Sequence, residues 1–401
     1  MTLRQSIMLM AMPMLAALPS PALAQETEPR SETGSEGEQE QASTFSLDLL
    51  YKADLFGVAA GDGARGTRFL DNVDLMASLD LERAAGWQGA SAYVGALSNA
   101  GARPNDIAGT LQGVDNIEVA RPDLLLYQAW VQQHFSGGRG SILVGKYDLN
   151  SEFYANPSAA SLIAPAFGIG SELAATGPNG PSIFPRTDLA IRVRLEDKHY
   201  YGQAAVIRAP RGVADKGGPR SALFIAEAGI KGRTAITLGG WTYSNRQQRI
   251  LPPGITLAPD TAASCGLYGL IEQDLIGHPS TMGYWRTFLR AGVSDGLTTP
   301  FAGGIQLGVT GQGVLPSRPE SLVSIGLATA GLSRAYRRAN PPDKPPLTRS
   351  ESTIELTYSD RVARFLTLQP DIQYVHRPSG LRHAPGVVVL GLRAILDWKV
   401  H

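Results

Sequence analysis

A period-two alternation of apolar and polar residues recurs along most of this chain, and it constrains the fold more than any other feature. In the clearest example, residues 188–196, the apolar side chains Leu189, Ile191, Val193 and Leu195 alternate with charged ones. Successive side chains of a β-strand point to opposite faces of a sheet, so this segment would have one apolar and one polar face. In a helix the same residues would be spread around the axis. The segment therefore predicts a strand.

The same alternation is repeated elsewhere, with turn residues between the repeats. It is clear in the segments 45–52, 285–293, 353–359, 366–374 and 388–398. Counting such segments gives about 16, an even number in the range of bacterial outer-membrane barrels. We therefore expect an all-β fold, a transmembrane antiparallel β-barrel of about 16 strands.

A soluble β-sandwich or propeller also has alternating strands, so it is the competing interpretation. Two observations favour the membrane barrel. Charged residues occupy the polar face of nearly every clear strand, as a wet interior requires. In addition, no strand has the sequence pattern of a strand that is fully buried on both faces, although a large soluble β-core would include such strands.

Composition narrows the possible functions. The 401 residues are 43% hydrophobic and 18% charged, which is the average expected when lipid-facing and lumen-facing residues alternate. Lys plus Arg and Asp plus Glu number 36 each, so net charge predicts no nucleic-acid partner. The single cysteine, Cys265, excludes an internal disulfide framework and a cysteine-built metal site.

The N-terminus has the pattern of an export signal. Arg4 precedes an apolar run, residues 7–18, and a small-residue cleavage pattern ends at Ala24. We predict a signal peptide at 1–24, an acidic disordered spacer at 25–43 and a barrel domain at 44–398. No later stretch reaches the roughly 18 apolar residues of a membrane helix, and we place the mature protein in the cell outer membrane.

Two stretches interrupt the strand rhythm. Residues 104–118 and 152–180 are long and rich in Gly, Ala, Pro and Asn. Irregular backbone is tolerated at membrane depth only where it is buried in protein or faces water. We therefore expect an inward-folded loop that narrows the pore.

Sequence motifs predict no catalytic residue, no metal site and no cofactor. Gly61 to Gly66 fits G-x-G-x-x-G, but an alternating strand follows it instead of the helix that a dinucleotide site needs. The six histidines show no metal-ligand spacing, and no G-x-S-x-G is present. A catalytic site assembled across strands leaves one alternative open, an outer-membrane barrel hydrolase or adhesin.

Charged side chains on the predicted lumen faces are the candidate constriction residues, because rings of such side chains set pore selectivity. The alternative is that these side chains have no role in selectivity: they keep the inner wall hydrated and pair with one another. The candidates are Lys146, Asp148, Asp188, Arg192, Arg194, Glu196, Arg286, Arg290, Glu355 and Arg393.

Several blocks of the sequence resemble the carbohydrate-selective porin family of the OprB type. They are Gly145 to Asp148, residues 177–185 (GPNGPSIFP), residues 368–374 (LQPDIQY) and residues 389–393 (VLGLR). The resemblance extends over residues 44–398. It implies a sixteen-stranded outer-membrane barrel that passes monosaccharides such as glucose through a charged, arginine-containing constriction. We expect outer-membrane lipid, small sugars and the barrel-assembly machinery as partners, and the oligomeric state is left open between monomer and homotrimer.

Overall fold

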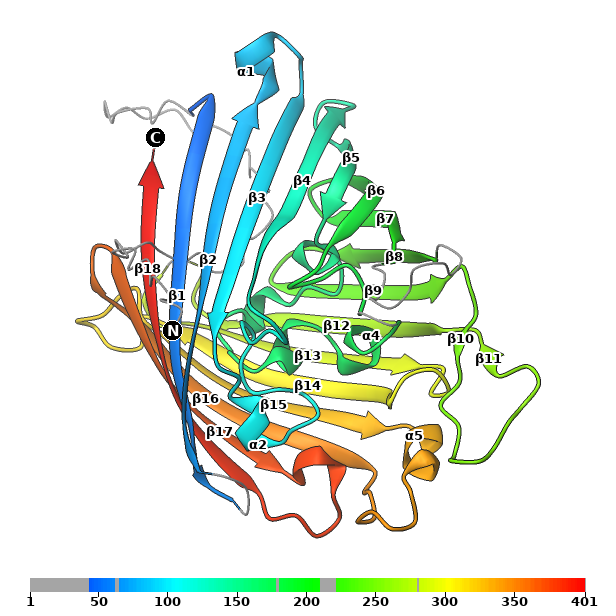
Figure 1. Ribbon diagram of the computed structural model, residues 1–401. Coiled ribbons are helices and arrows are strands. Elements are labelled where there is room, and N and C mark those ends of the chain that lie inside the picture. Colours follow the sequence, from blue (N-terminus) through cyan, green and yellow to red (C-terminus); the bar gives the residue numbers. More distant parts are fainter. Residues whose placement is uncertain (1–42, 62–64, 178–179, 210–220, 280, 401) are drawn as a thin grey trace, which may run out of the picture.

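The computed structural model describes residues 43–61, 65–177, 180–209, 221–279 and 281–400. Within these residues, 16 antiparallel strands form a closed barrel (Figure 1), which confirms the predicted fold class. Each strand pairs with its neighbours along the chain, and β1 closes the barrel by pairing with β18. The predicted signal peptide and nearly all of the predicted spacer lie outside the described residues.

The barrel strands are β1 (Phe45–Ala60), β2 (Gly66–Asp80), β3 (Ala90–Gly101), β4 (Asp123–Phe135), β5 (Gly140–Tyr147), β6 (Asp188–Glu196), β7 (Tyr200–Arg208), β8 (Ala222–Ile230), β9 (Thr234–Tyr243), β12 (Cys265–Ile276), β13 (Tyr284–Ser294), β14 (Phe301–Gln312), β15 (Leu322–Leu332), β16 (Ser350–Ala363), β17 (Leu366–His376) and β18 (Val387–Val400). A small separate sheet pairs β10 (Gln247–Gln248) with β11 (Thr261–Ala262).

The helices are short and lie in the connections. They are α1 (Leu81–Ala85), α2 (Asn105–Ala108), α3 (Pro165–Gly168), α4 (Ser171–Ala174), α5 (Arg334–Ala339) and the 3-10 turns η1 (Leu149–Ser151), η2 (Pro157–Ala159) and η3 (Pro378–Gly380). None of those in the described residues has the length and apolar character needed to cross a membrane.

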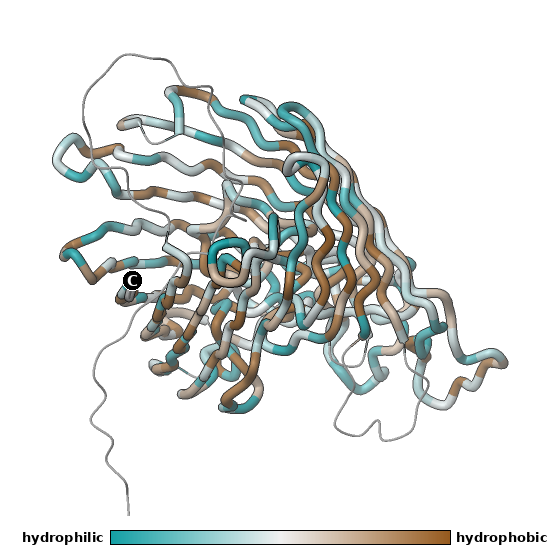
Figure 2. Tube along the Cα trace, turned by 90° about the horizontal axis from the view of Figure 1, so that it is seen from above, coloured by the Kyte–Doolittle hydropathy of each residue, from teal (hydrophilic) through white to brown (hydrophobic). Residues whose placement is uncertain are grey.

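The strand β6 has the apolar outer face and the polar inner face that its alternation predicts. Ile191 and Leu195 are each 55% exposed on the outer face, whereas Arg192 is 1% exposed on the inner face. The other barrel strands also carry exposed aliphatic side chains on their outer faces, and brown apolar residues recur along the strands in Figure 2. The outer surface therefore has the apolar character that contact with hydrocarbon requires.

The two ends of the barrel differ in the length of their connections. At one end the turns are short, as at 136–139, 197–199 and 231–233; we call it the short-turn end. At the other, the long-loop end, lie the connections 102–122, 148–187, 244–264 and 333–349. Outer-membrane barrels have short periplasmic turns and longer extracellular loops.

The strand β8 is apolar on both faces, although only its inner face is buried. Its outer face carries Phe224, which is 44% exposed, whereas Leu223 and Ile225 on the inner face are buried. These two belong to a core cluster with Leu173 of the 148–187 connection. The inner face is apolar here because a loop, instead of water, covers it.

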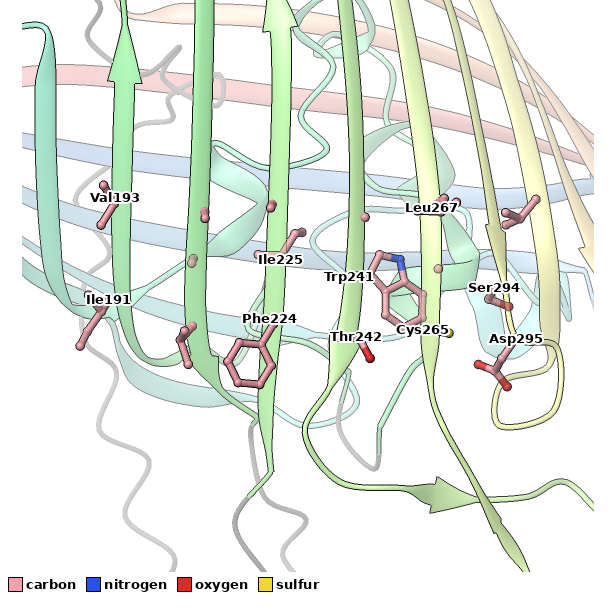
Figure 3. A pocket seen from close by; sticks show the side chains of 17 residues that line it. Ile191, Val193, Phe224, Ile225, Trp241, Thr242, Cys265, Leu267, Ser294 and Asp295 are labelled. Atoms are coloured by element: carbon pink, nitrogen blue, oxygen red, sulfur yellow. The ribbon is translucent and has the colours of Figure 1, made fainter.

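An apolar hollow of about 780 Å³ lies over β6–β9, β12 and β13 (Figure 3). Outer-face side chains such as Val193, Phe224 and Leu267 line it, and Cys265 is also one of the lining residues. These side chains face away from the lumen, so the hollow belongs to the lipid-facing surface and is separate from any solute path.

Candidate pore and its inward-folded loops

The described part of the connection 148–187 lies inside the barrel, as expected for a loop that narrows a pore. Wall carboxylates accept hydrogen bonds from its backbone amides. Tyr154 N donates to Glu227 Oε2 at 3.0 Å, and Ser158 N donates to Glu272 Oε1 at 2.9 Å. Farther round the wall, the amides of Ile163 and Ala164 donate to Glu355. Because this loop has little regular structure of its own, its amides need acceptors from elsewhere, and the wall supplies them.

Wall arginines satisfy the opposite half of the loop backbone. Arg290 is fully buried and donates to the carbonyl oxygens of Tyr154 at 3.3 Å, Ala166 at 2.8 Å and Gly168 at 3.0 Å. One guanidinium therefore holds three carbonyl groups, which its fork of fixed N–H donors makes possible.

A second arginine fixes the start of the same loop. Arg192 Nε lies 2.7 Å from Glu152 Oε2, and the guanidinium also donates to Ser141 and Gln132 of the wall. Glu152 is the residue that follows η1. This buried, bidentate ion pair joins the loop to β6 on the inner face of the barrel.

Glu172 is the most enclosed carboxyl group of the loop. Tyr154 Oη donates to its Oε1 at 2.7 Å, while its Oε2 has no hydrogen-bond partner. Burial raises the pKa of Glu172, and the bond from Tyr154 opposes this shift. The Cβ of any residue in place of Gly292 would lie 1.9 Å from Glu172 Oε1, so the loop packs directly on the backbone of β13.

The connection 102–122 forms a second inward-folded loop. The amides of Leu111 and Gln112 donate to the carboxylate of Glu351 at 2.9–3.0 Å, and Gln373 donates to Val114 O at 2.8 Å. Arg393 lies beneath this loop and contacts Asp115.

The ten residues predicted for the constriction occupy different environments. Arg192, Arg290, Glu355 and Arg393 are buried and hold the two inward-folded loops or their neighbours. Asp148 lies at the start of the 148–187 loop and accepts from Tyr127 Oη at 2.6 Å.

Arg194, Glu196 and Arg286 keep partly exposed side chains on the inner face. Arg194 Nη2 lies 2.9 Å from Glu196 Oε2, and Lys231 Nζ lies 2.6 Å from the same oxygen. Arg286 pairs with Asp274 at 3.2 Å. Of the ten predicted residues, Arg194 and Glu196 are the only two that an ion pair joins within the described part of the chain.

The other two candidates lie where β5 and β6 meet the 148–187 connection. Lys146 is in register with Leu189, whose side chain is on the outer face, and its amine donates to Thr187 O. Asp188 pairs with Arg208 at the end of β7.

Strand parity alone did not single out several residues that hold the loops. Glu227 shares a face with Leu223 and Ile225, a face that its neighbours make apolar. An isolated carboxylate on an apolar strand face was the signal that could have identified it, since a buried charge needs hydrogen-bond donors nearby. The other such residues are Asp54, Asp115, Glu152, Glu172, Glu272 and Glu351.

Comparison with solved structures places the fold among bacterial porins. The chain is similar to OprB of Pseudomonas putida in its high-pH structure, with a TM-score of 0.77 and 21% identity over 88% of this chain and 94% of that one. The low-pH structure of that protein matches with a TM-score of 0.57 at 17% identity, covering 88% and 92%. The trimer form of OmpT of Vibrio cholerae matches with a TM-score of 0.53 at 11% identity, covering 89% and 100%.

A search of curated proteins finds no match. The family profile described as "Carbohydrate-selective porin, OprB family" matches residues 64–396, most of the barrel. The chain therefore belongs to the OprB family of carbohydrate-selective porins.

Proposed function

We propose that this protein is an outer-membrane porin through which small hydrophilic solutes, monosaccharides among them, diffuse passively. The observation that carries the proposal is a closed barrel with an apolar exterior, whose interior holds two loops on polar and charged wall residues. Barrels of this size enclose an aqueous channel. Family membership supplies the class of solute.

Passage requires binding that is weak enough to release the solute. A sugar exchanges hydration water for hydrogen bonds to the charged side chains that line the lumen, and arginine and carboxylate groups offer fixed donors and acceptors for its hydroxyls. No bond of the solute is made or broken, so the proposed function needs no catalytic residue.

The predicted constriction residues divide into two proposed roles. Arg194, Glu196 and Arg286 keep inner-face exposure and are proposed to meet the solute. The buried Arg192, Arg290, Glu355 and Arg393 are proposed to shape the lumen indirectly, by holding the loops that narrow it. Asp148 and Asp188 are proposed to fix the two ends of the 148–187 loop. Lys146 is in register with the outer-face Leu189 and is proposed to contribute least to solute binding.

A liposome-swelling assay tests the proposal. We expect purified protein to admit glucose faster than a disaccharide and a disaccharide faster than a trisaccharide, because the loops narrow the lumen. Swelling no faster than in protein-free liposomes would contradict a porin function.

The two proposed roles can be separated by conductance in planar bilayers. The substitution Arg194→Ala is expected to change conductance and glucose block without lowering the thermal midpoint, because its ion pair is partly exposed and such pairs contribute only about 0–1 kcal/mol. Arg192→Ala should lower the midpoint, because it leaves Glu152 without its buried partner. If the two variants change conductance and the thermal midpoint to the same extent, the separation into solute-contacting and loop-holding residues is contradicted.

The export and assembly of the chain are also proposals. We propose that a leader is cleaved after Ala24, that residues 25–43 form a periplasmic spacer before the barrel at 44–398, and that the short-turn end faces the periplasm. Mass spectrometry of the protein from outer membranes would locate the mature N-terminus.

We further propose a homotrimer, supported by the trimer form of the similarly folded OmpT. Light scattering of the detergent-solubilised protein should give three times the mass of one chain. A mass of one chain would contradict it.

A further inference from the structure

A cluster of cations lies in the connection between β15 and β16, outside the residues discussed above. This connection, residues 333–349, surrounds a hollow of about 580 Å³ that we call the basic mouth pocket. Five cationic side chains line it: Arg334, Arg337, Arg338, Lys344 and Arg349. Asp343, the single acidic residue of the connection, does not line it.

The five cations lack anionic partners among the residues that the structure describes. Across the described residues, no ion pair joins any of the five to a carboxylate. This contrasts with the lumen, where Arg192 and Arg393 are paired with carboxylates. Neighbouring charges of one sign repel each other, so an anion that enters the pocket relieves repulsion as well as gaining contacts.

The helix α5 concentrates three of these charges. Arg334, Arg337 and Arg338 follow the i, i+3, i+4 spacing that places side chains on one face of a helix. Like charges at this spacing destabilise a helix. The helix is nevertheless well anchored, because Ser333 accepts from Tyr336 N at 3.0 Å and caps its start.

The pocket is held in place at the long-loop end, above the inward-folded loops. Tyr336 packs against Leu332 and Phe301, together with Leu111 and Ala175 of the two loops inside the barrel. Figure 1 shows α5 at the end of β15. Arg349 directly precedes β16, its carbonyl oxygen accepts from Leu332 N at 2.8 Å, and it is two residues from Glu351, which holds the 102–122 loop.

The return segment of the connection has a restricted backbone. It contains Pro341, Pro342, Pro345 and Pro346, which restrict the backbone. Pro346 O also accepts from Arg382 N at 2.9 Å, which ties the segment to the β17–β18 connection. Side chains on a rigid frame lose less entropy when they bind a ligand.

We propose that the basic mouth pocket binds the phosphate or carboxylate groups of acidic carbohydrates at the long-loop entrance of the pore. The inference deepens the proposed function and rests on it, because it assigns a class of ligand to the entrance of that channel. Guanidinium groups suit this ligand, since they bind phosphate and carboxylate oxygens in bidentate fashion. Two sources carry the same chemistry: a free acidic sugar and the phosphorylated headgroup of lipopolysaccharide.

Calorimetric titration of the detergent-solubilised protein with inorganic pyrophosphate at low salt tests the proposal. The triple variant Arg334→Gln, Arg338→Gln and Arg349→Gln should bind at least about tenfold more weakly, since each charge-assisted contact is among the stronger hydrogen bonds. A matched control removes three cations from the short-turn end: Arg139→Gln, Lys198→Gln and Arg364→Gln. We expect it to bind within about twofold of the wild type, because these three residues lie at the opposite end of the barrel and cannot contact an anion in the pocket.

Equal binding by the wild type and the triple variant, or no binding by the wild type, would overturn the proposal. Glucose-driven swelling is expected to be the same for all three proteins. That readout separates loss of the pocket from loss of the fold, and separates failure of this inference from failure of the porin function.

The two sources are distinguished by reconstitution. The titration is repeated in phosphatidylcholine vesicles with and without lipopolysaccharide. If lipopolysaccharide abolishes pyrophosphate binding by the wild type, the pocket takes the lipid headgroup. If binding persists and glucose 6-phosphate competes with pyrophosphate, the pocket takes a free acidic sugar. Either result supports the proposed chemistry.

Discussion

At the scale of single residues, the clearest case is Arg393, at the seam where the first and last strands meet. Arg393 is directly opposite Asp54 in the β1–β18 register, and Nη2 of the arginine lies 2.6 Å from Asp54 Oδ2. The same guanidinium reaches Asp115 and Asn116 of the 102–122 loop. One buried cation therefore joins the closure of the barrel to the position of an inner loop.

Two carboxylates share this one guanidinium, which makes the attachment of the loop sensitive to pH. Burial raises the pKa of Asp115, and repulsion by Asp54 raises it further, while Arg393 opposes the shift. A folded-state pKa above the unfolded value means that protonation favours the folded state. The stabilisation is complete below the unfolded value, about 3.9, and is lost as pH rises through the folded value.

We predict that the thermal midpoint falls as the pH rises from the unfolded-state pKa of Asp115 through its folded-state pKa. The fall should be smaller in Asp115→Asn. The asparagine cannot ionise, so it removes this contribution and leaves the Arg393–Asp54 pair intact. Melting curves of both proteins from pH 4 to pH 8 (roughly the interval in which a raised carboxyl pKa acts) provide the measurement. Parallel pH profiles would show that Asp115 does not contribute.

At the scale of elements, the 148–187 loop is held by the wall more than by its own structure. Its helices α3 and α4 have four residues each, so hydrogen bonds from its backbone to wall residues replace those within a long helix. The loop also needs room, and small residues of the wall provide it. Gly292 of β13 is such a residue, because its missing side chain leaves space for Glu172 and Tyr154.

The substitution Gly292→Ala should displace α4 from the wall. The added methyl group would overlap Glu172 Oε1 and Tyr154 Oη, and overpacking of this kind costs about 1–3 kcal/mol. We expect a lower thermal midpoint and an altered size limit for sugars in the swelling assay. Gly202→Ala is the matched control, because no atom lies within 4 Å of its Cβ position. Similar behaviour of the two variants would contradict direct packing of the loop on β13.

At the scale of the whole molecule, the barrel separates two solvents. Aliphatic side chains such as Ile305 and Leu307 on β14 are exposed on the outer face, and their neighbour Gln306 is fully buried inside. An exposed aliphatic belt of this extent would be unfavourable in water, whereas it suits a bilayer.

We predict that Leu307→Arg, near the middle of β14, destabilises the protein in bilayers by about 2–4 kcal/mol, the cost of a cation at the membrane midplane. The control is Leu257→Arg, an exposed position in the 244–264 connection, where the charge stays in water. Folding into phospholipid vesicles can be followed by the gel shift between the folded and unfolded forms, over a urea series. Equal midpoints for the two variants would argue against a lipid-facing position for Leu307.

The sequence by itself determined the class of fold and the face of most strand residues. The period of two is a local property, so segments such as 188–196 reveal their apolar face without knowledge of their neighbours. Membership of the OprB family was also indicated by contiguous motifs. The long stretches without strand rhythm predicted the inward-folded loop, although not its two anchoring ends at 148 and 187.

Only the tertiary structure decided which inner-face charges remain open to the lumen. Arg192 and Arg194 have the same parity on β6, but the first is buried against Glu152 and the second stays partly exposed. The difference arises because the start of the 148–187 loop, which joins β5 to β6, folds back over Arg192 and leaves Arg194 partly exposed, and such coverage depends on a contact between residues 40 positions apart in the chain. The apolar inner face of β8 has the same cause.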